Sequence, residues 1–220
     1  MAKIAVIVSD ISNEAADIKG GLSIPLPDHA TGEMKPTWFN ALPNIKYLVE
    51  AARAKGIPII YVSDMLPEKT PEFDIWPKHY MAGTKGCQPW DELGKMDVIV
   101  GKVNYQPMFG KAGEEIIAAL RKWDIDTVIV VGITIPAEMQ NIAYVLIPTP
   151  GIRDPKRPEL GYTVIFPRDC CSGMFSYTEV DYVLRDMKRL CGHKMIITSA
   201  YELVKSNFKI TKDTQSYTVE

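Results

Sequence analysis

The chain has 220 residues, 46% of them hydrophobic and 24% charged, with a formal net charge of −2. These values are typical of a globular protein with one large domain. The small net charge and the lack of a basic run give no sign of a nucleic-acid partner, so we expect none. No apolar run reaches the roughly 18 residues of a membrane span, and the N-terminal run is a strand pattern rather than a signal peptide. We therefore expect a cytoplasmic protein whose four cysteines, which lack CxxC spacing, are reduced.

Short apolar runs alternate with helical patterns along the chain. β-branched and aliphatic clusters predict buried strands at 3–10, 57–64, 96–102, 126–133, 162–169 and 194–204, the last with a short helical end. Apolar residues at helical spacing predict helices at 41–56, 110–125, 136–146 and 178–192. This alternation predicts an α/β fold, a three-layer αβα sandwich around a six-stranded, mainly parallel sheet. We expect a single domain over 1–208 and a polar tail over 209–220.

Three segments do not follow this alternation. Residues 20–40 and 65–95 are rich in proline, glycine and aromatic residues, and we expect both to lie over the carboxyl ends of the strands. Loops of this length in a compact domain usually serve a function. The third segment, 147–161, contains four prolines and has the character of an insertion.

Charged residues stand where the predicted strands end. Asp10 ends the first strand, Asp64 the second and Lys102 the third, and Glu138 begins the helix after the fourth. Ligands of open parallel sheets bind beyond the carboxyl ends of the strands. Charged residues also end strands for no functional reason, because the chain leaves the core there, so this position alone keeps both interpretations open.

Five segments carry known motifs. VSDISNE (8–14) resembles a D-M-Q-N-D motif, PEFDIWPKHYMAGTKG (71–86) a W-P-x-H…G-T-x-G motif, and VIVGKVNYQPMFG (98–110) a K-x-x-Y-x-x-F motif. VIVVGITIPAE (128–138) resembles a segment ending G-x-x-T-x-x-C, and VIFPRDCCSG (164–173) a D-A-x-A-S segment. Over nearly its whole length the chain is similar to the isochorismatase-like cysteine hydrolases, which include nicotinamidases and N-carbamoylsarcosine amidases. The resemblance implies their Rossmann-like fold.

The catalytic triad of that family is Asp, Lys and Cys. The resemblance implies that Asp10 and Lys102 are the first two members, and alignment on Gly132 places Glu138 at the position of the nucleophilic cysteine. Asp10, Lys102 and Glu138 are therefore the candidate catalytic residues. The chain has four cysteines, and none of them stands at a position from which it obviously replaces that thiol. They are Cys87, Cys170, Cys171 and Cys191.

The resemblance also implies positions that bind a substrate, and the aromatic ones suit a planar or apolar ligand, although packing of a lid explains them equally well. These candidate binding residues are Asn13, Trp76, Tyr105, Phe109, Ile133, Thr134 and Ile135. Ala15 stands where the family has an aromatic residue, which enlarges the expected pocket. In the family a cis peptide shapes the oxyanion hole, and the matching bond here is Thr134–Ile135, at a cost of about 3–4 kcal/mol for a non-proline bond.

Nicotinamidases bind a metal through a D-x-H motif and a second histidine. The corresponding segment here, Asp64-Met65-Leu66, lacks the first histidine, and His79 belongs to the W-P-x-H segment, where we interpret it as structural. We therefore expect no metal at this site and no other cofactor. Because family members are commonly dimers or tetramers, the resemblance implies a homo-oligomer.

A glutamate in place of the thiol leaves three hypotheses open. In the first, the protein hydrolyses an amide, urea or vinyl ether without a thiol: Asp10 is the general acid, Glu138 positions or deprotonates water and Lys102 balances the charge. Isochorismatases proper, which lack the cysteine, are a precedent. In the second, the protein is catalytically silent and binds a small ligand or a partner protein. In the third, the carboxylates hold a divalent metal, which Lys102 opposes.

Overall fold

The computed structural model describes residues 3–17, 37–147, 161–173 and 177–210. Its strands are β1 (Ile4–Ser9), β2 (Ile59–Asp64), β3 (Val98–Lys102), β4 (Thr127–Gly132), β5 (Thr163–Pro167) and β6 (Met195–Thr198). Its α-helices are α1 (Asn13–Ala16), α2 (Leu42–Ala54), α3 (Gly110–Lys122), α4 (Gln140–Leu146), α5 (Tyr177–Cys191) and α6 (Ala200–Lys205). Short helices of other types are η1 (Thr37–Asn40), η2 (Pro71–Asp74), η3 (Asp91–Leu93), η4 (Ile135–Met139), η5 (Arg168–Cys170) and η6 (Gly192–Lys194).

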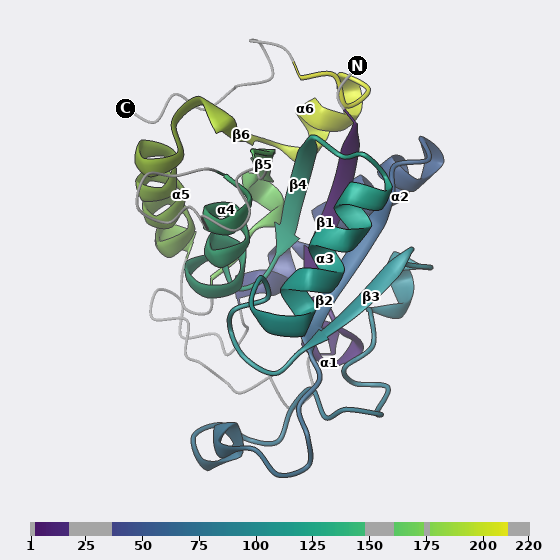
Figure 1. Ribbon diagram of the computed structural model, residues 1–220, viewed down its shortest axis with the longest axis vertical. Coiled ribbons are helices and arrows are strands. Elements are labelled where there is room, and N and C mark those ends of the chain that lie inside the picture. Colours follow the sequence, from purple (N-terminus) through teal and green to yellow (C-terminus); the bar gives the residue numbers. More distant parts are fainter. Residues whose placement is uncertain (1–2, 18–36, 148–160, 174–176, 211–220) are drawn as a thin grey trace.

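The strands form one sheet in the order β3-β2-β1-β4-β5-β6, and every pair in it is parallel. The sheet that the sequence predicts as mainly parallel is therefore parallel throughout. β1 and β4 lie side by side at its centre, in register from Ile4 opposite Thr127 to Ser9 opposite Gly132. Because all strands run the same way, their carboxyl ends meet at one edge of the sheet, the lower edge in Figure 1.

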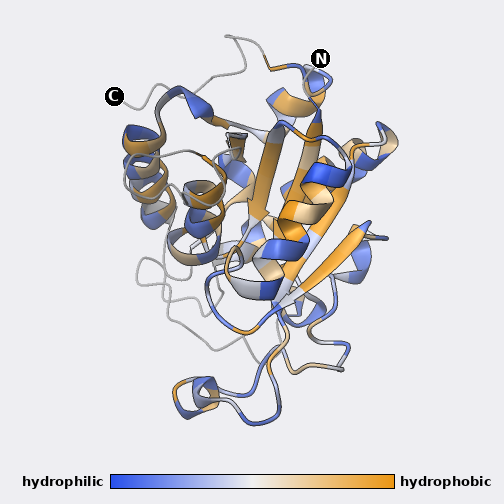
Figure 2. Ribbon diagram, viewed as in Figure 1, coloured by the Kyte–Doolittle hydropathy of each residue, from blue (hydrophilic) through white to orange (hydrophobic). Residues whose placement is uncertain are grey.

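Helices cover both faces of this sheet. Residues of α3, α4 and α5 pack on one face, against Ala5 and Ile7 of β1, and residues of α2 and α6 pack on the other, against Val6 and Val8. Alternate residues of the same strand thus enter two separate cores, as the period of two in a strand requires. Figure 2 shows the central strands as hydrophobic along their length, whereas the helices present hydrophilic residues outward. The three-layer αβα architecture is confirmed.

The predicted elements are found with small shifts at their ends. The helix predicted over 136–146 begins with a π-helical turn, η4, before α4. The first part of segment 65–95 does lie at the carboxyl end of the sheet, since Met65 N–H donates to Lys102 and Leu66 N–H donates to Tyr80. Its last part returns toward the start of β3, where the Leu93 and Lys95 carbonyls accept from Arg53. Most of segment 20–40, nearly all of 147–161 and most of the tail lie outside the described residues.

The long helices are amphipathic covers of the sheet. α2 buries Leu42, Ile45, Leu48, Val49 and Ala52, which lie at helical spacing on one side. Such a helix is stable because one apolar stripe meets the core while the other side stays polar. Within the parts of the chain that the structure describes, no helix has the length and apolar character needed to cross a membrane.

Candidate active site

Four charged side chains meet at the carboxyl edge of the sheet. In the order of the strands they are Lys102 at the end of β3, Asp64 at the end of β2, Asp10 directly after β1 and Glu138 in η4 after β4. Each is buried, with a relative exposure of 3–4%. The structure thus brings the three predicted catalytic residues together and adds Asp64, which was not predicted to be catalytic.

Lys102 is the centre of this group. Its Nζ lies 2.9 Å from Asp64 Oδ1, 3.3 Å from Asp10 Oδ2 and 3.6 Å from Glu138 Oε1. We call these four residues the carboxylate–lysine cluster. Neither Lys102 Nζ nor Asp64 Oδ1 makes a hydrogen bond of good geometry to any residue that the structure describes. One buried cation therefore faces three buried carboxyl groups.

Asp10 is fixed by neighbours on β1 and β2 and by Tyr80. Its backbone has a φ of 54°, an uncommon value for a residue with a side chain, and its N–H donates to Val62. Its Oδ1 accepts from the Asp64 N–H at 3.1 Å and its Oδ2 accepts from Ser9 Oγ at 3.1 Å. The Tyr80 hydroxyl donates to the Asp10 carbonyl at 2.9 Å. These contacts aim the carboxylate at Lys102.

Glu138 is held by the start of its own helix. Its Oε2 accepts from the Thr134 N–H at 3.0 Å and from the Thr134 hydroxyl. Thr134 is the N-cap of η4, and its backbone N–H has no acceptor within the helix. The Glu138 side chain reaches back and accepts this hydrogen bond. The positive end of the helix dipole also favours a carboxylate there. One oxygen of Glu138 is therefore anchored, and the other, Oε1, faces Lys102.

The close approach of these groups shifts their proton affinities. Burial raises the pKa of Asp64 to about 8, although Lys102 partly offsets the effect. Burial also raises the pKa of Glu138, as does the Asp10 carboxylate, against Lys102 and the Thr134 hydrogen bonds. For Lys102, burial lowers the pKa, but the three carboxylates outweigh burial and hold the pKa above its usual range. The cluster therefore retains a proton near neutral pH, beside a charged lysine.

The cluster does not have the chemistry of a metal site. The segment after β2 offers Asp64 followed by Met65 and Leu66, and Asp64 Oδ1 is already 2.9 Å from the Lys102 ammonium. A cation in this place would meet that ammonium, and no imidazole of the described residues supports the carboxylates. Across the described ranges, no group of three or more His, Cys, Asp or Glu side chains is arranged to hold a metal ion.

The predicted binding residues fall into two groups. Thr134 lies in the site as a hydrogen-bond donor to Glu138, and Ile133 and Ile135 beside it are buried in the two cores. Asn13 instead holds a loop: its Nδ2 donates to Pro89 O at 3.0 Å and its Oδ1 accepts from the Asp91 N–H at 3.0 Å. The hydrogen bonds of Asn13 thus hold the loop at Pro89 and Asp91 in place. Contact of Asn13 with a substrate stays a prediction.

The aromatic residues lie nearer the surface. Tyr105 is 44% exposed and Phe109 60% exposed, while Trp76 is half-buried. The Tyr105 hydroxyl donates to Glu72, and burial together with that carboxylate raises the pKa of Tyr105. Their binding role stays a prediction.

His79 is buried, as its structural interpretation requires. Its Nδ1 lies 2.6 Å from Pro77 O and its Nε2 3.6 Å from Glu72. The imidazole therefore joins two parts of segment 65–95.

The cis peptide bond precedes Thr134 rather than following it. It joins Ile133 to Thr134, so the bond predicted at Thr134–Ile135 was placed one residue too late. The alignment on Gly132 predicted the segment that contains the cis peptide but not which of its bonds is cis. Gly132 itself is required, because its φ is 123° and a side chain there would lie 2.0 Å from the Ser9 carbonyl oxygen.

The four cysteines are all buried and unpaired with one another. Cys170 and Cys171 follow β5, and burial raises the pKa of both thiols well above the ordinary value. Burial also raises the pKa of Cys191, at the end of α5, to about 11. Nucleophilic thiols have the opposite character, an accessible position and a lowered pKa. These three cysteines therefore lack the environment of a nucleophile.

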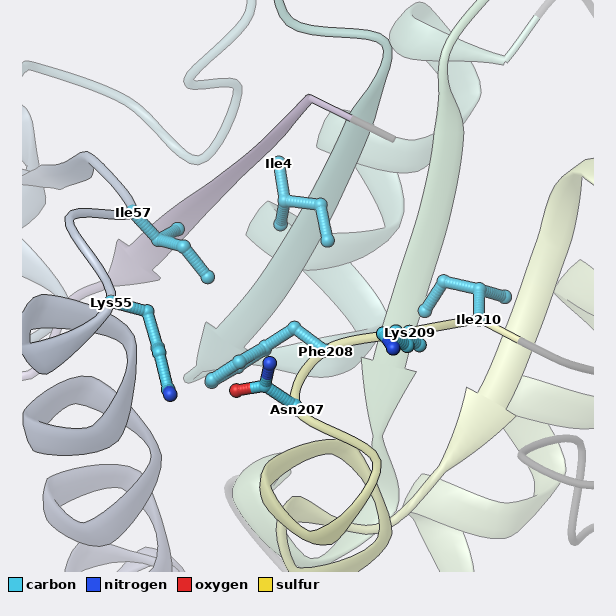
Figure 3. A pocket seen from close by; sticks show the side chains of 7 residues that line it. All are labelled: Ile4, Lys55, Ile57, Asn207, Phe208, Lys209 and Ile210. Carbon is cyan, nitrogen blue, oxygen red and sulfur yellow. The ribbon is translucent and has the colours of Figure 1, made fainter. Parts of the chain in front are cut away.

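A cavity of about 430 Å³ lies away from the cluster. It opens beside Ile4, at the amino end of β1, and Figure 3 shows its lining: Ile4, Lys55, Ile57, Asn207, Phe208, Lys209 and Ile210. Its charged side chains, Lys55 and Lys209, are exposed. No group of the carboxylate–lysine cluster lines it.

Solved structures share this architecture. An isochorismatase-like hydrolase from Alkaliphilus metalliredigens is 17% identical with a TM-score of 0.70, over 93% of this chain and 99% of that one. Pyrazinamidase of Pyrococcus horikoshii, in complex with zinc, is 19% identical with a TM-score of 0.68, over 90% and 99%. N-carbamoylsarcosine amidase from Thermoplasma acidophilum is 21% identical with a TM-score of 0.63, over 90% and 96%. The fold is thus that of the isochorismatase-like hydrolases.

Sequence comparison gives the family itself. The model of the isochorismatase domain matches residues 5–144, more than half of the chain. The chain therefore belongs to the isochorismatase family. A comparison with curated proteins finds no match.

Proposed function

We propose that this protein hydrolyses an amide, urea or vinyl-ether bond in a small molecule, and that it does so without a nucleophilic thiol. The observation that carries the proposal is the buried ammonium of Lys102 within 3.6 Å of Asp10, Asp64 and Glu138. Groups that share protons in this way are the means by which enzymes perform acid and base chemistry near neutral pH.

Each member of the cluster has a role in this proposal. Glu138 is anchored through Oε2, so its Oε1 is free to hold a water molecule and to take the proton that water loses on attack. Asp10 gives a proton to the leaving group. Lys102 stabilises the negative charge that moves between the two carboxyl groups. After product release the proton returns from Glu138 to Asp10, and the cycle is balanced.

The thiol-independent mechanism rests on Glu138 and on the cysteines. By the resemblance of segment 128–138 to the family motif, Glu138 occupies the position of the family's nucleophile. A carboxylate is a poor nucleophile toward an amide but an effective base toward water. The raised pKa values of Cys170, Cys171 and Cys191 also argue against another thiol as the nucleophile.

A second function, binding without turnover, is favoured by the bonding of Glu138. Its Oε2 already accepts two hydrogen bonds from Thr134, and its Oε1 faces Lys102, so the side chain fills the site with an internal ion pair. In this alternative the protein is a catalytically silent member of the family that binds a small ligand or a partner protein.

One experiment separates these functions. Purified protein is incubated with small amides, ureas and vinyl ethers while consumption of each compound and the melting temperature are measured. Hydrolysis predicts that at least one compound is consumed, whereas silent binding predicts a raised melting temperature with no consumption. Gain of amidase activity in Glu138→Cys alone would show that only the nucleophile was lost, and would favour the silent function.

We also propose a single domain over 1–208, a cytoplasmic location and a homo-oligomer of two or four chains. The family resemblance supports the oligomer. Light scattering on the purified chain tests it, and a monomeric mass at micromolar concentration would contradict it.

A further inference from the structure

The cavity of Figure 3 lies at the amino end of the sheet, away from the carboxylate–lysine cluster. Its volume of about 430 Å³ falls within the range of small-molecule sites. Four apolar side chains, two lysines and one asparagine line it, and no acidic residue of the described chain does. We propose that this cavity binds a small amphipathic anion, an apolar chain that ends in a carboxylate.

The polar residues at the rim of the cavity are free to bind that carboxylate. Lys55, Asn207 and Lys209 are exposed, and their side chains make no hydrogen bond or ion pair with any residue that the structure describes. Lys55 follows α2, whereas Asn207 and Lys209 follow α6, so donors from two helix ends flank one cavity. Figure 3 shows the Lys55 side chain extending from α2 toward Asn207. Two cations without an acidic neighbour in the lining are complementary to a ligand carboxylate.

The ends of both helices leave these lysines available. A helix C-terminus attracts cations through its unpaired carbonyl groups. Here the residues that follow bind such carbonyls: Ile57 N–H donates to Ala52 O at 3.0 Å after α2, and Phe208 N–H donates to Leu203 O at 2.8 Å after α6. The chain itself thus caps carbonyls that would otherwise compete with a ligand for the two lysines.

The floor of the cavity suits the apolar part of the ligand. Ile4 and Phe208 are 9% and 5% exposed, so they belong to the core and hold the shape of the floor. Ile4 and Ile57 also line a neighbouring cavity of about 540 Å³, to which Trp123 and Ile125 contribute. An apolar chain that runs from the lysines along Ile4 and Ile57 therefore leaves water over its length.

The chain after α6 is shaped for this lining. Asn207 and Phe208 have φ values of 56° and 57°, which are uncommon for residues with side chains. This conformation turns Phe208 into the core, while its neighbours Asn207 and Lys209 stay exposed at the rim. One short turn thus supplies both apolar floor and polar rim.

Only a ligand with both parts uses the whole site. An inorganic anion meets the lysines but not the floor, and an uncharged hydrocarbon meets the floor but not the lysines. An anionic membrane surface is held by clusters of about four to eight basic residues, more than this rim provides. None of the lining residues belongs to the carboxylate–lysine cluster, so this inference does not depend on the proposed hydrolysis.

The first test varies the charge of the ligand and keeps its length. Octanoate, octanol and octylammonium, each below its micelle concentration, are titrated calorimetrically into the protein. Octanoate should bind at one site per chain, more tightly than the other two and more weakly as salt is added. Its Kd should be about 4- to 16-fold below that of hexanoate, because two more methylene groups are buried. Absence of saturable octanoate binding, or equal binding of all three compounds, overturns the proposal.

Variants of the rim locate the site. Lys55→Ala and Lys209→Ala should each raise the Kd of octanoate by about 2- to 5-fold, as expected for exposed ion pairs, and should leave that of octanol unchanged. The matched control is Lys111→Ala, which removes a lysine of α3 whose side chain is 89% exposed. A Kd for octanoate that is the same in the parent and in both rim variants contradicts the proposal.

Reversal of the rim charge should give the converse result. With Lys55→Glu and Lys209→Glu combined, octylammonium should bind more tightly than octanoate. Circular dichroism checks that this double variant keeps the fold, and if the fold is lost, the two alanine variants decide the question. Continued preference for octanoate in a folded double variant overturns the proposal.

Other occupants of the cavity would give other results. Sedimentation of the protein with phosphatidylglycerol vesicles, lost in the double variant, would assign the cavity to a membrane surface. A change in oligomeric mass on addition of octanoate, measured by light scattering, would assign it to a second copy of the chain. Either result overturns the proposal of a free anion. Because none of these measurements uses a substrate, their failure is distinct from failure of the proposed hydrolysis.

Discussion

The two ends of the sheet use charge in opposite ways. At the carboxyl end, Lys102 and Asp64 form an ion pair whose side chains are 1% and 6% exposed. At the amino end, Lys3 pairs with Asp124, and these side chains are 57% and 81% exposed. Water screens the second pair but not the first, so the same kind of contact has a large effect on the fold and its chemistry only at the carboxyl end.

The difference follows from the connections of the chain. The segment that leaves the carboxyl end of β2 turns back across that edge, where the Tyr80 hydroxyl donates to the Asp10 carbonyl. The charged residues of the cluster are buried there. At the amino end the cavity of Figure 3 is lined by exposed lysines, which remain hydrated. Acid–base chemistry is therefore expected at the covered end.

Removal of the central cation should have the largest effect. Lys102→Met leaves the three carboxyl groups of the cluster without it, and loss of one partner of a buried pair costs about 3–5 kcal/mol of unfolding free energy. Urea unfolding at pH 7 measures the loss. Because Lys102 contacts Asp64, the further change Asp64→Asn should not add independently to this loss. A Lys102→Met protein as stable as its parent would contradict the importance of the buried charges.

The pH dependence of stability should report Asp64. Its pKa is about 8 in the folded protein and 3.8 is its ordinary value, so between these values the folded state holds a proton that the unfolded state has released. Stability from this group is full below about pH 4 and is lost as the pH rises through about 8, by at most about 1.4 kcal/mol per pH unit. Asp64→Asn should therefore gain stability over the parent as the pH rises.

Urea midpoints at pH 5, 7 and 9 check this slope. Asp74→Asn, which changes an exposed carboxylate of η2, is the control and should follow the parent. If Asp64→Asn shows the slope of the parent, the proton is held by another group.

A smaller effect is expected at the rim of the site. Tyr105→Phe removes the hydrogen bond to Glu72, and a typical bond of this kind contributes about 0.5–1.5 kcal/mol to stability. Phe109→Ala, at a position 60% exposed, should change stability less. Thermal melts compare the loss of stability in the two variants. A larger loss in Phe109→Ala than in Tyr105→Phe would mean that Phe109 packs more tightly than its exposure indicates.

The amino end should respond least. Lys3→Met breaks the exposed pair with Asp124, and the melting temperature should remain close to that of the parent in low and in high salt. This variant matches Lys102→Met in chemistry and differs in place. A comparable loss of stability in both would remove the distinction between the two ends.

The fold could be predicted from the sequence because its elements are local patterns. Continuous β-branched runs such as 126–133 have the length of a buried strand, and their alternation with helices leaves few topologies. The type of the first helical turn could not be predicted, because nothing in 136–146 distinguishes a π-helical start from an α-helix.

The candidate site was predicted only in part. Asp10, Lys102 and Glu138 were found through strand ends and the family resemblance, and the structure brings them together. Asp64 carried the same strand-end signal, but its importance depends on β2 lying between β1 and β3, which no local pattern reveals. Asn13 shows the converse, because its side chain is turned toward Pro89 and Asp91 by contacts 76 and 78 residues away in sequence.

The central claim, that the carboxylate–lysine cluster performs hydrolysis, is tested most directly by Asp10→Asn. The parent, this variant and the Asp74→Asn control are compared for turnover of any compound that the parent consumes. Loss of a general acid should reduce kcat by about 10²- to 10⁴-fold in Asp10→Asn, with the control unchanged. Turnover by Asp10→Asn at the rate of the parent would contradict the account.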